Sequence, residues 1–392
     1  MDYSFLVYCI LLIGGVCCAF FAERKNNPIW LIIIIGLFSI VAGYRAESVG
    51  KDTISYISIF KQIWGGELQA SYGEYGFKYM VSLLGKISLS PNFSLLIIAM
   101  ITHTLIVFRI WDFKDKISFP IAVFCYYIQF YSFSLNGVRQ MLAVSLVFFA
   151  TRYIRRKEHI LFFILTTIAA LFHISALMGM VFFVVDIAIR AWLFDKKAAL
   201  MQFIVLGILG CTILIVGYEM LAKGVERLLT VYLKDITLDF GFMLPFKICL
   251  LIVTSYLVFS SQETCVQIYF EEREKSFITG EYLYNKTYGW SERSGNKILL
   301  DYKKENCYET ISLYVYYLIG LLVASSGYFY VFLNRMGLYF YLFEAVYMGR
   351  LLKYNKNKIL FAFILILFAY IFIVDMIGNG QGQLPYLFIW QQ

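Results

Sequence analysis

Long apolar stretches separated by short polar loops run through most of the chain. A helix that spans a bilayer needs about 20 mostly apolar residues, and the sequence contains about twelve candidates, several of them short. They lie near residues 3–22, 29–43, 93–110, 118–133, 138–153, 159–173, 174–189, 198–218, 242–261, 310–332, 337–350 and 358–376. Their apolar character is continuous rather than alternating, which excludes a membrane β-barrel. The pattern predicts an all-α, polytopic membrane protein forming one domain over residues 1–392.

Composition supports a membrane environment. The 392 residues are 60% hydrophobic and only 15% charged, whereas a soluble domain is about 25% charged. The eight cysteines include no CxxC pair, so they indicate small buried side chains rather than a metal site or a disulfide framework. We therefore expect no metal, no cofactor and no nucleic-acid partner.

Lysine and arginine are concentrated in alternate loops, which predicts the orientation of the chain in the membrane. The basic loops are 23–27, 111–116, 155–159, 190–197 and 353–358, together with the long polar segment 262–309. These loops are predicted to be cytoplasmic, with 262–309 as a solvated excursion. Residues 44–92, carrying an amphipathic helix, and the loop 219–241 would then be external, as would both termini.

Four polar residues gather at the predicted outer face. Arg45, Arg139, His173 and Arg335 all lie at the outer ends of apolar stretches. Arginine is disfavoured on that side, and a charge within a membrane protein usually has a functional reason. Each has a simpler interpretation: Arg45 or Arg335 could extend toward lipid headgroups, and His173 could be a satisfied residue at a helix end. Together, the four residues favour an anion site.

The segment NGVRQ adds a local geometry suited to phosphate. Asn136 is a favoured N-cap residue, Gly137 permits close approach of a ligand to the backbone, and Arg139 falls in the first turn of the following helix. Backbone N–H groups and a guanidinium could then point toward one anion. Asparagine and glycine are also ordinary turn residues, so a simple turn is the alternative.

The segment YRAESVGKDTISYISIF supplies carboxylates and aromatic rings near the same face. Asp52 or Glu47 could accept a proton from a hydroxyl group, although Glu47 is better explained by a local ion pair. Tyr56 and Phe60 are one helical turn apart and would form an aromatic face able to pack on lipid or sugar.

Four pieces in order resemble the EpsG branch of the Wzy-type O-antigen and capsular polysaccharide polymerases. They are YRAESVGKDTISYISIF, NGVRQMLAVSLVFFA with RYIRRKEHILFFI behind it, FHISAL and FLNRMGLYFYLF, followed by the ending GQGQLPYLFIW. The resemblance covers the chain from about residue 30 to its end. It implies a helical fold similar to the GT-C-like polymerases. The segment 262–309 is longer and more charged than this family suggests.

The resemblance also implies a reaction, in which a glycan leaves undecaprenyl pyrophosphate and joins a hydroxyl group of a new lipid-linked repeat unit at the periplasmic face. Arg139, with Arg45 and Arg335, would stabilise the departing pyrophosphate without a metal. His173 would assist the leaving group, and Asp52 is the candidate base. Further substrate contacts are expected from Gln140, Asn136, Tyr56 and Asn334.

Other functions compete with this interpretation. A flippase of lipid-linked oligosaccharides would also need cations, but it would place charges deep within its spans and show two related halves. An O-antigen ligase uses the same donor with a different acceptor, and a structural scaffold would leave the one-sided cations unexplained. The resemblance places the protein in the bacterial inner membrane, with membrane lipids, a chain-length regulator and a flippase as partners.

Overall fold

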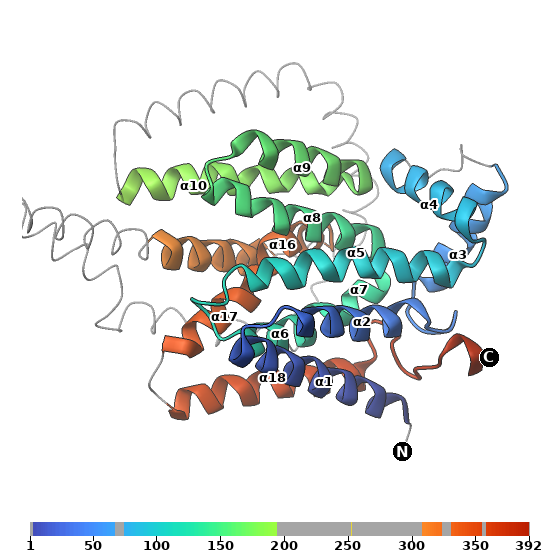
Figure 1. The fold of residues 1–392 in the computed structure, drawn as a ribbon, viewed down its shortest axis with the longest axis horizontal. Coiled ribbons are helices and arrows are strands. Elements are labelled where there is room, and N and C mark those ends of the chain that lie inside the picture. Colours follow the sequence, from blue (N-terminus) through green and yellow to red (C-terminus); the bar gives the residue numbers. More distant parts are fainter. Residues whose placement is uncertain are drawn as a thin grey trace, which may run out of the picture.

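The computed structural model describes residues 3–66, 74–193, 252, 308–323, 331–354 and 358–391, which contain helices and no β-strand (Figure 1). The helices are α1 (Tyr3–Lys25), α2 (Ile29–Gly43), α3 (Thr53–Trp64), α4 (Tyr75–Ile87), α5 (Pro91–Trp111), α6 (Phe119–Tyr126), α7 (Ser132–Asn136), α8 (Val138–Arg155), α9 (His159–Phe172), α10 (Met180–Leu193), α16 (Val331–Tyr341), α17 (Phe343–Tyr354) and α18 (Lys358–Gly378). A further helix covers Tyr308–Val323. A π-helical turn, Tyr127–Tyr131, joins α6 to α7, and 3-10 helices cover Ile174–Gly179 and Ile389–Gln391. The all-α prediction is confirmed for this part of the chain.

Several described helices have the length and composition of membrane spans. Ser4–Lys25, Pro91–Trp111 and Phe361–Gly378 are long and apolar enough to cross a bilayer, and three shorter apolar helices are Ile29–Gly43, His159–Phe172 and Tyr308–Val323. The count of twelve spans stays a prediction, because 198–218, nearly all of 242–261 and part of 310–332 lie outside the described residues. The loop 219–241 and residues 262–307 also lie outside them.

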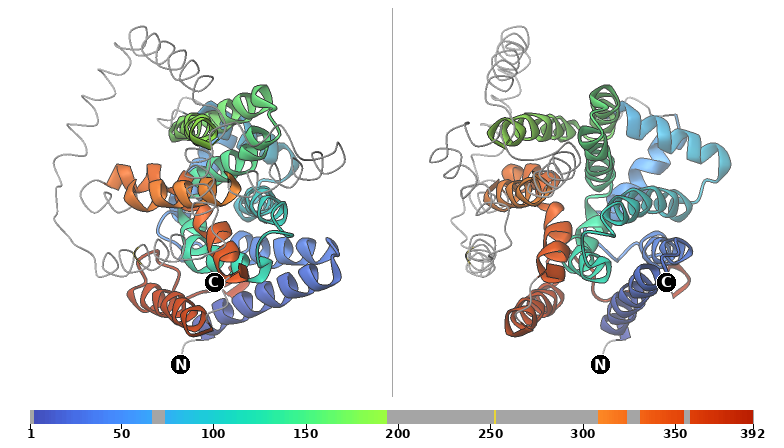
Figure 2. Two further views of the ribbon diagram at one scale, coloured as in Figure 1. Left: turned by 90° about the vertical axis from the view of Figure 1, so that its left-hand side faces the viewer. Right: turned by 60° about the vertical axis from the view of Figure 1, so that its left-hand side comes forward.

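Aromatic side chains pack the centre of the bundle. The π-helical turn stacks the rings of Tyr127 and Tyr131 at 4.9 Å. Their hydroxyl groups donate to the backbone oxygens of Tyr8 (2.8 Å) and Phe38 (3.0 Å), which ties this turn to α1 and α2. His103 on α5 stacks on Tyr131 with ring centroids 5.7 Å apart. At the edge of the bundle α1 and α18 lie side by side (Figures 1 and 2).

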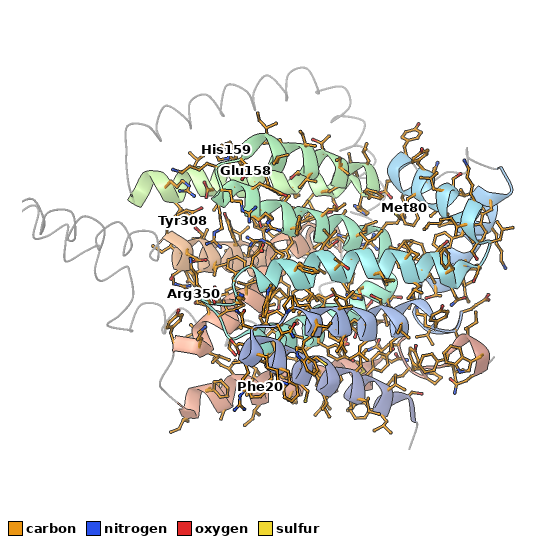
Figure 3. The ribbon with its side chains drawn as sticks, viewed as in Figure 1. Phe20, Met80, Glu158, His159, Tyr308 and Arg350 are labelled. Atoms are coloured by element: carbon orange, nitrogen blue, oxygen red, sulfur yellow. The ribbon has the colours of Figure 1, made fainter. Side chains whose placement is uncertain are left out.

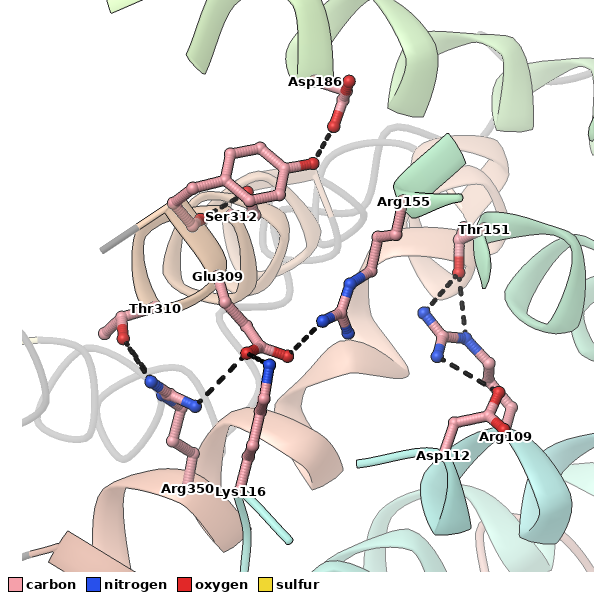
Figure 4. A network of polar contacts seen from close by, with 11 residues as sticks. Arg109, Asp112, Lys116, Thr151, Arg155, Asp186, Glu309, Thr310, Ser312 and Arg350 are labelled. Carbon is pink, nitrogen blue, oxygen red and sulfur yellow. Dashed lines mark hydrogen bonds and ion pairs between the residues drawn. The ribbon is translucent and has the colours of Figure 1, made fainter. Parts of the chain in front are cut away.

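A charged cluster joins the helices at one end of the bundle, which we call the charged end. The Glu309 carboxylate is buried and forms ion pairs with Lys116, Arg155 and Arg350 (Figure 4). Glu309 is the last residue of the predicted polar loop 262–309, and in the structure it lies in the first turn of the helix Tyr308–Val323. Cations from three other segments satisfy the carboxylate, so it can lie inside the bundle.

The predicted basic loops meet at this end. Lys114 donates to the side chain of Asn26, and the Lys353 ammonium donates to the backbone oxygen of Asp115 at 3.0 Å. Three of the loops that the sequence predicts on the cytoplasmic side therefore lie together. The opposite end of the bundle carries α3 and α4, so that Met80 on α4 lies far from Tyr308 and Arg350 (Figure 3).

The C-terminal segment, residues 379–391, returns to the loop between α2 and α3 and closes the end that carries α3 and α4. The Ala46 N–H donates to the backbone oxygen of Leu387 at 2.8 Å, and the Gly50 N–H donates to that of Gly382 at 2.7 Å. Gly50 and Gly382 have φ values of +89° and +66°, which L side chains rarely adopt. These two glycines let the loop and the tail run against each other.

Candidate functional site

A cavity of about 480 Å³ opens at the end of the bundle that carries α3 and α4, which we call the pocket end. Its volume lies within the range of about 300–1,000 Å³ that is usual for small-molecule sites. Five separate segments line it: the loop before α3 with α3 itself, the α7–α8 turn, the residue after α9, α16 and the C-terminal tail. The lining residues are Lys51, Asp52, Tyr56, Phe133, Asn136, Gly137, Arg139, Gln140, His173, Arg335, Leu338 and Gln381.

The α7–α8 turn builds the centre of the pocket. There is no space for a side chain at Gly137, because a Cβ there would lie 2.6 Å from the Phe133 ring. Asn136 does not cap α8, contrary to the prediction. Its amide instead donates to the backbone oxygen of Gln381 at 2.7 Å and accepts from the Asp52 N–H at 3.3 Å. Asn136 therefore holds the loop before α3, the α7–α8 turn and the tail together.

Arg139 projects from the first turn of α8 and pairs with Glu74. The distance from Arg139 Nη1 to Glu74 Oε2 is 2.6 Å, and the two side chains are 20% and 16% exposed. The guanidinium also lies 5.7 Å from the centre of the Phe77 ring on α4. Burial raises the pKa of the Glu74 carboxyl above its ordinary value, and the positive charge of Arg139 opposes this shift. The pair links the start of α4 to the pocket.

His173 follows the last residue of α9 and faces the same carboxylate. Its Nε2 lies 3.9 Å from Glu74 Oε1. Its Nδ1 accepts from the Ser175 N–H at 3.4 Å and lies 2.6 Å from the Ser175 hydroxyl, which is 2.9 Å from that of Tyr339. Burial, reinforced by the charges of Arg139 and Arg335, lowers the pKa of His173 to about 4. His173 is therefore neutral at neutral pH, with the ring proton assigned to Nε2.

The third part of the site comes from α16. The Gln140 amide donates to the backbone oxygen of Arg335 at 2.7 Å, which joins α8 to α16. The Arg335 side chain is exposed and lines the cavity. Among the described residues, no carboxylate lies within ion-pair distance of Arg335. The side chain of Asn334 lies outside the described part of the structure.

Arg45 is not part of the cavity lining, although the sequence favours it as a pyrophosphate ligand. Its side chain is 1% exposed. The guanidinium donates to the backbone oxygens of Ala42 and Leu135, the latter at 2.7 Å, and to the Thr53 hydroxyl at 3.0 Å. Arg45 therefore acts on the pocket only indirectly, by fixing the segments that carry it.

The predicted aromatic face is also placed differently. Phe60 is fully buried, and its ring centroid lies 6.1 Å from that of Phe77. Tyr56 is buried too, although its edge reaches the cavity, and its hydroxyl accepts from the Arg139 N–H at 3.5 Å. The amphipathic period of α3 buries these rings against α4, so they are not available to lipid.

Three residues of the site were not predicted from the sequence: Glu74, Lys51 and Gln381. Glu74 is a single carboxylate 65 positions before its arginine partner in the chain. Lys51 and Gln381 both line the cavity, and the Lys51 N–H donates to the backbone oxygen of Gln381 at 3.2 Å. Lys51 lies in YRAESVGKDTISYISIF, the first of the four pieces that carry the resemblance, but its role in the cavity was not predicted.

The apolar helices and the position of the cavity define a membrane-embedded helical protein with a polar pocket at one end of its bundle. The chain belongs to the EpsG family, whose family model matches residues 28–388 and so includes every residue of the pocket. This family is associated with polysaccharide polymerases, which are glycosyltransferase-like proteins. The resemblance predicted from the four sequence pieces is confirmed. Comparison with curated proteins and with solved structures found no significant match.

Proposed function

We propose that the protein is a Wzy-type polysaccharide polymerase, which joins oligosaccharide repeat units carried on undecaprenyl pyrophosphate by glycosyl transfer. Membership of the EpsG family supports the general activity. The observation that carries the proposal is the gathering of Lys51, Arg139 and Arg335, from three distant segments, around one cavity. A pyrophosphate leaving group carries charge on two phosphoryl groups, and fixed cations stabilise such charge as it develops.

The proposed reaction breaks the bond between the sugar's anomeric carbon and pyrophosphate. The bonding electrons leave with the pyrophosphate, an acceptor hydroxyl oxygen forms the new bond to the anomeric carbon, and the hydroxyl proton passes to a carboxylate. Asp52 lines the cavity and is the proposed acceptor of this proton. His173, neutral and donating through Nε2, would hydrogen bond to the substrate or the leaving group.

Within this proposal the cations have different tasks. Arg335 and Lys51 line the cavity without a carboxylate partner among the described residues, so both are free to meet an anion. Arg139 is held by Glu74, which fixes its direction. Asn136, Gln140 and Tyr56 lie around these groups and are the proposed contacts for the substrate's polar atoms. Arg45 supports the pocket from behind.

The pocket end is proposed to face the periplasm and the charged end the cytoplasm. Lysines and arginines of loops that meet at the charged end support this orientation. We further propose that the protein lies in the bacterial inner membrane and crosses it about twelve times. Its proposed partners are membrane lipids, a chain-length regulator and a flippase.

The test is polymerisation of a synthetic pyrophosphate-linked repeat unit by the purified protein, with products separated by length. The wild type should give a ladder of chains longer than one unit, and Arg335→Ala should lose this ladder. The control is Arg24→Ala, which changes a basic residue in the last turn of α1, far from the cavity, and should keep the ladder. Retention of the ladder by Arg335→Ala would contradict the role of the cations. Transfer of a single unit only, to a different acceptor, would favour a ligase.

A further inference from the structure

Helix α4 carries an apolar row that no described residue covers. Tyr75, Tyr79, Leu83 and Ile87 follow at intervals of four and are 80%, 67%, 41% and 73% exposed. Four-residue spacing places them along one side of the helix, over about 18 Å. The opposite side packs into the protein through other apolar residues, which are Phe77, Val81 and Leu84. The helix therefore has two apolar faces, of which only one is used inside the protein.

A polar stripe separates these two faces on one side. It consists of Lys78, Ser82 and Lys86, again at intervals of four. A helix with an apolar row beside a basic polar stripe is typical of segments that lie at a membrane surface. Four large apolar side chains in a continuous row need an apolar partner, because a row of this size in water is unfavourable.

The row on α4 meets a second exposed row on α9. Ile160, Ile164, Ile168 and Leu171 are all exposed, and their spacing places them on one face of that apolar helix. The two rows join where α4 begins. A Cβ on Gly76 would lie 2.7 Å from Cβ of Leu171, so the two helices approach each other closely at this point. A continuous apolar surface thus turns a corner from α9 onto α4.

This corner lies next to the pocket. Tyr75 directly follows Glu74, which pairs with Arg139 at 2.6 Å. On α9, Leu171 precedes His173, another residue of the cavity, by two positions. The apolar corner and the cation-lined cavity therefore share a border at Glu74 and His173. A ligand with an anionic head and a long hydrocarbon chain would find a complementary surface for each part.

We propose that this corner, formed by the exposed rows of α4 and α9, binds the hydrocarbon chain of an amphiphilic anionic substrate while its head occupies the cavity. The inference rests on the proposed function for the identity of the head, and it adds that the chain is recognised by the protein. Substrate would then enter from the membrane side, along α9, and the chain would stay outside the cavity during the reaction.

The test measures binding without turnover, by titrating the full-length protein in detergent with two pyrophosphate-linked sugars. One carries a long polyisoprenoid chain and the other a short, water-soluble chain. Replacing Tyr79 and Leu83 together by Gln should weaken binding of the long-chain compound about tenfold. It should leave the short-chain compound unaffected, because only the long chain reaches the row. The matched control is Ser82→Gln with Lys86→Gln on the polar stripe, which should change neither.

Equal losses for both compounds, or no loss for either, would overturn the proposal; no loss is expected if the row only faces bilayer lipid, and equal losses are expected if the substitutions disturb the fold. Tyr79→Ile with Leu83→Met keeps the row apolar and should retain the preference for the long chain, which separates chain recognition from a folding defect. Polymerisation is assayed separately. A wild type that prefers long chains and makes no polymer would refute the proposed function and leave this surface in place.

Discussion

The pair between Arg139 and Glu74 can be tested by a double-mutant cycle, because the structure assigns the two residues different roles. Arg139 lines the cavity, whereas Glu74 contacts Arg139 and His173 from behind. If Glu74 acts only by positioning Arg139, its replacement should matter only while Arg139 is present. The cycle consists of Glu74→Ala, Arg139→Ala and the double variant.

The magnitudes follow from the geometry. Loss of one preorganised charge at a leaving group lowers the rate on the order of 10²–10³-fold, and this is the expectation for Arg139→Ala. The hydrogen bond between the partners joins two charged groups at 2.6 Å, and both side chains are mostly buried. Such bonds contribute about 1.5–3 kcal/mol, so Glu74→Ala should lower the rate about 10- to 100-fold. The double variant should be no slower than Arg139→Ala alone.

The assay is the initial rate of polymerisation of a pyrophosphate-linked repeat unit, with Glu47→Ala as control. Glu47 is an exposed carboxylate in the loop before α3, and its loss should leave the rate unchanged. If the two losses multiply in the double variant, Glu74 acts independently of Arg139, for example as the base itself. A faster Glu74→Ala protein would show that the carboxylate competes with the substrate's anion for Arg139. Either result would refute the positioning role.

Three further predictions follow from other contacts. Glu309→Gln should destabilise the protein by about 3–5 kcal/mol, measured by chemical unfolding, because it leaves three cations at the charged end without their carboxylate. Gly50→Ala should lower the free energy of unfolding by about 1–3 kcal/mol and slow polymerisation, since the φ of Gly50 is +89° and a Cβ there would lie 3.0 Å from Asn136 Oδ1. The control is Gly36→Ala, because Gly36 has open space around it. The pKa of His173 is lowered to about 4, so the unfolded chain binds a proton there between about pH 6.5 and 4 while the folded protein does not. Stability should therefore fall on acidification through this range, and His173→Gln should reduce the fall; an unchanged pH dependence would contradict the burial of a neutral ring.

Elements whose apolar pattern is long and continuous could be predicted from the sequence. The apolar stretches at 3–22, 29–43, 93–110 and 138–153 correspond to α1, α2, α5 and α8 within a few residues, because burial in an apolar environment selects the same residues that the pattern counts. The break between α16 and α17 within 337–350 was not predictable, since no proline or glycine marks Leu342, the residue between the two helices.

The polar residues of the site were predictable only in part. Arg139, His173 and Arg335 line the cavity as a group, which agrees with their shared position at the ends of apolar stretches. Glu74 was missed, because nothing near it in sequence indicates a partner 65 residues away. Asn136 was expected as a helix cap, but the tail competes for its amide, and that tail lies 245 residues further along the chain.

Arg45 shows why a buried arginine can be structural. In sequence it resembles Arg335, since both stand at the end of an apolar stretch. Its guanidinium, however, has no carboxylate partner among the described residues and instead donates to the backbone oxygens of Ala42, in the last turn of α2, and Leu135, in the last turn of α7. The final carbonyl groups of a helix lack intrahelical donors and carry the negative end of the helix dipole. A single cation between two such ends satisfies both, and it fixes the point at which the loop to α3 and the turn to α8 leave the bundle. Because these two segments carry Asp52 and Arg139, the geometry of the pocket depends on a charge that does not itself line it.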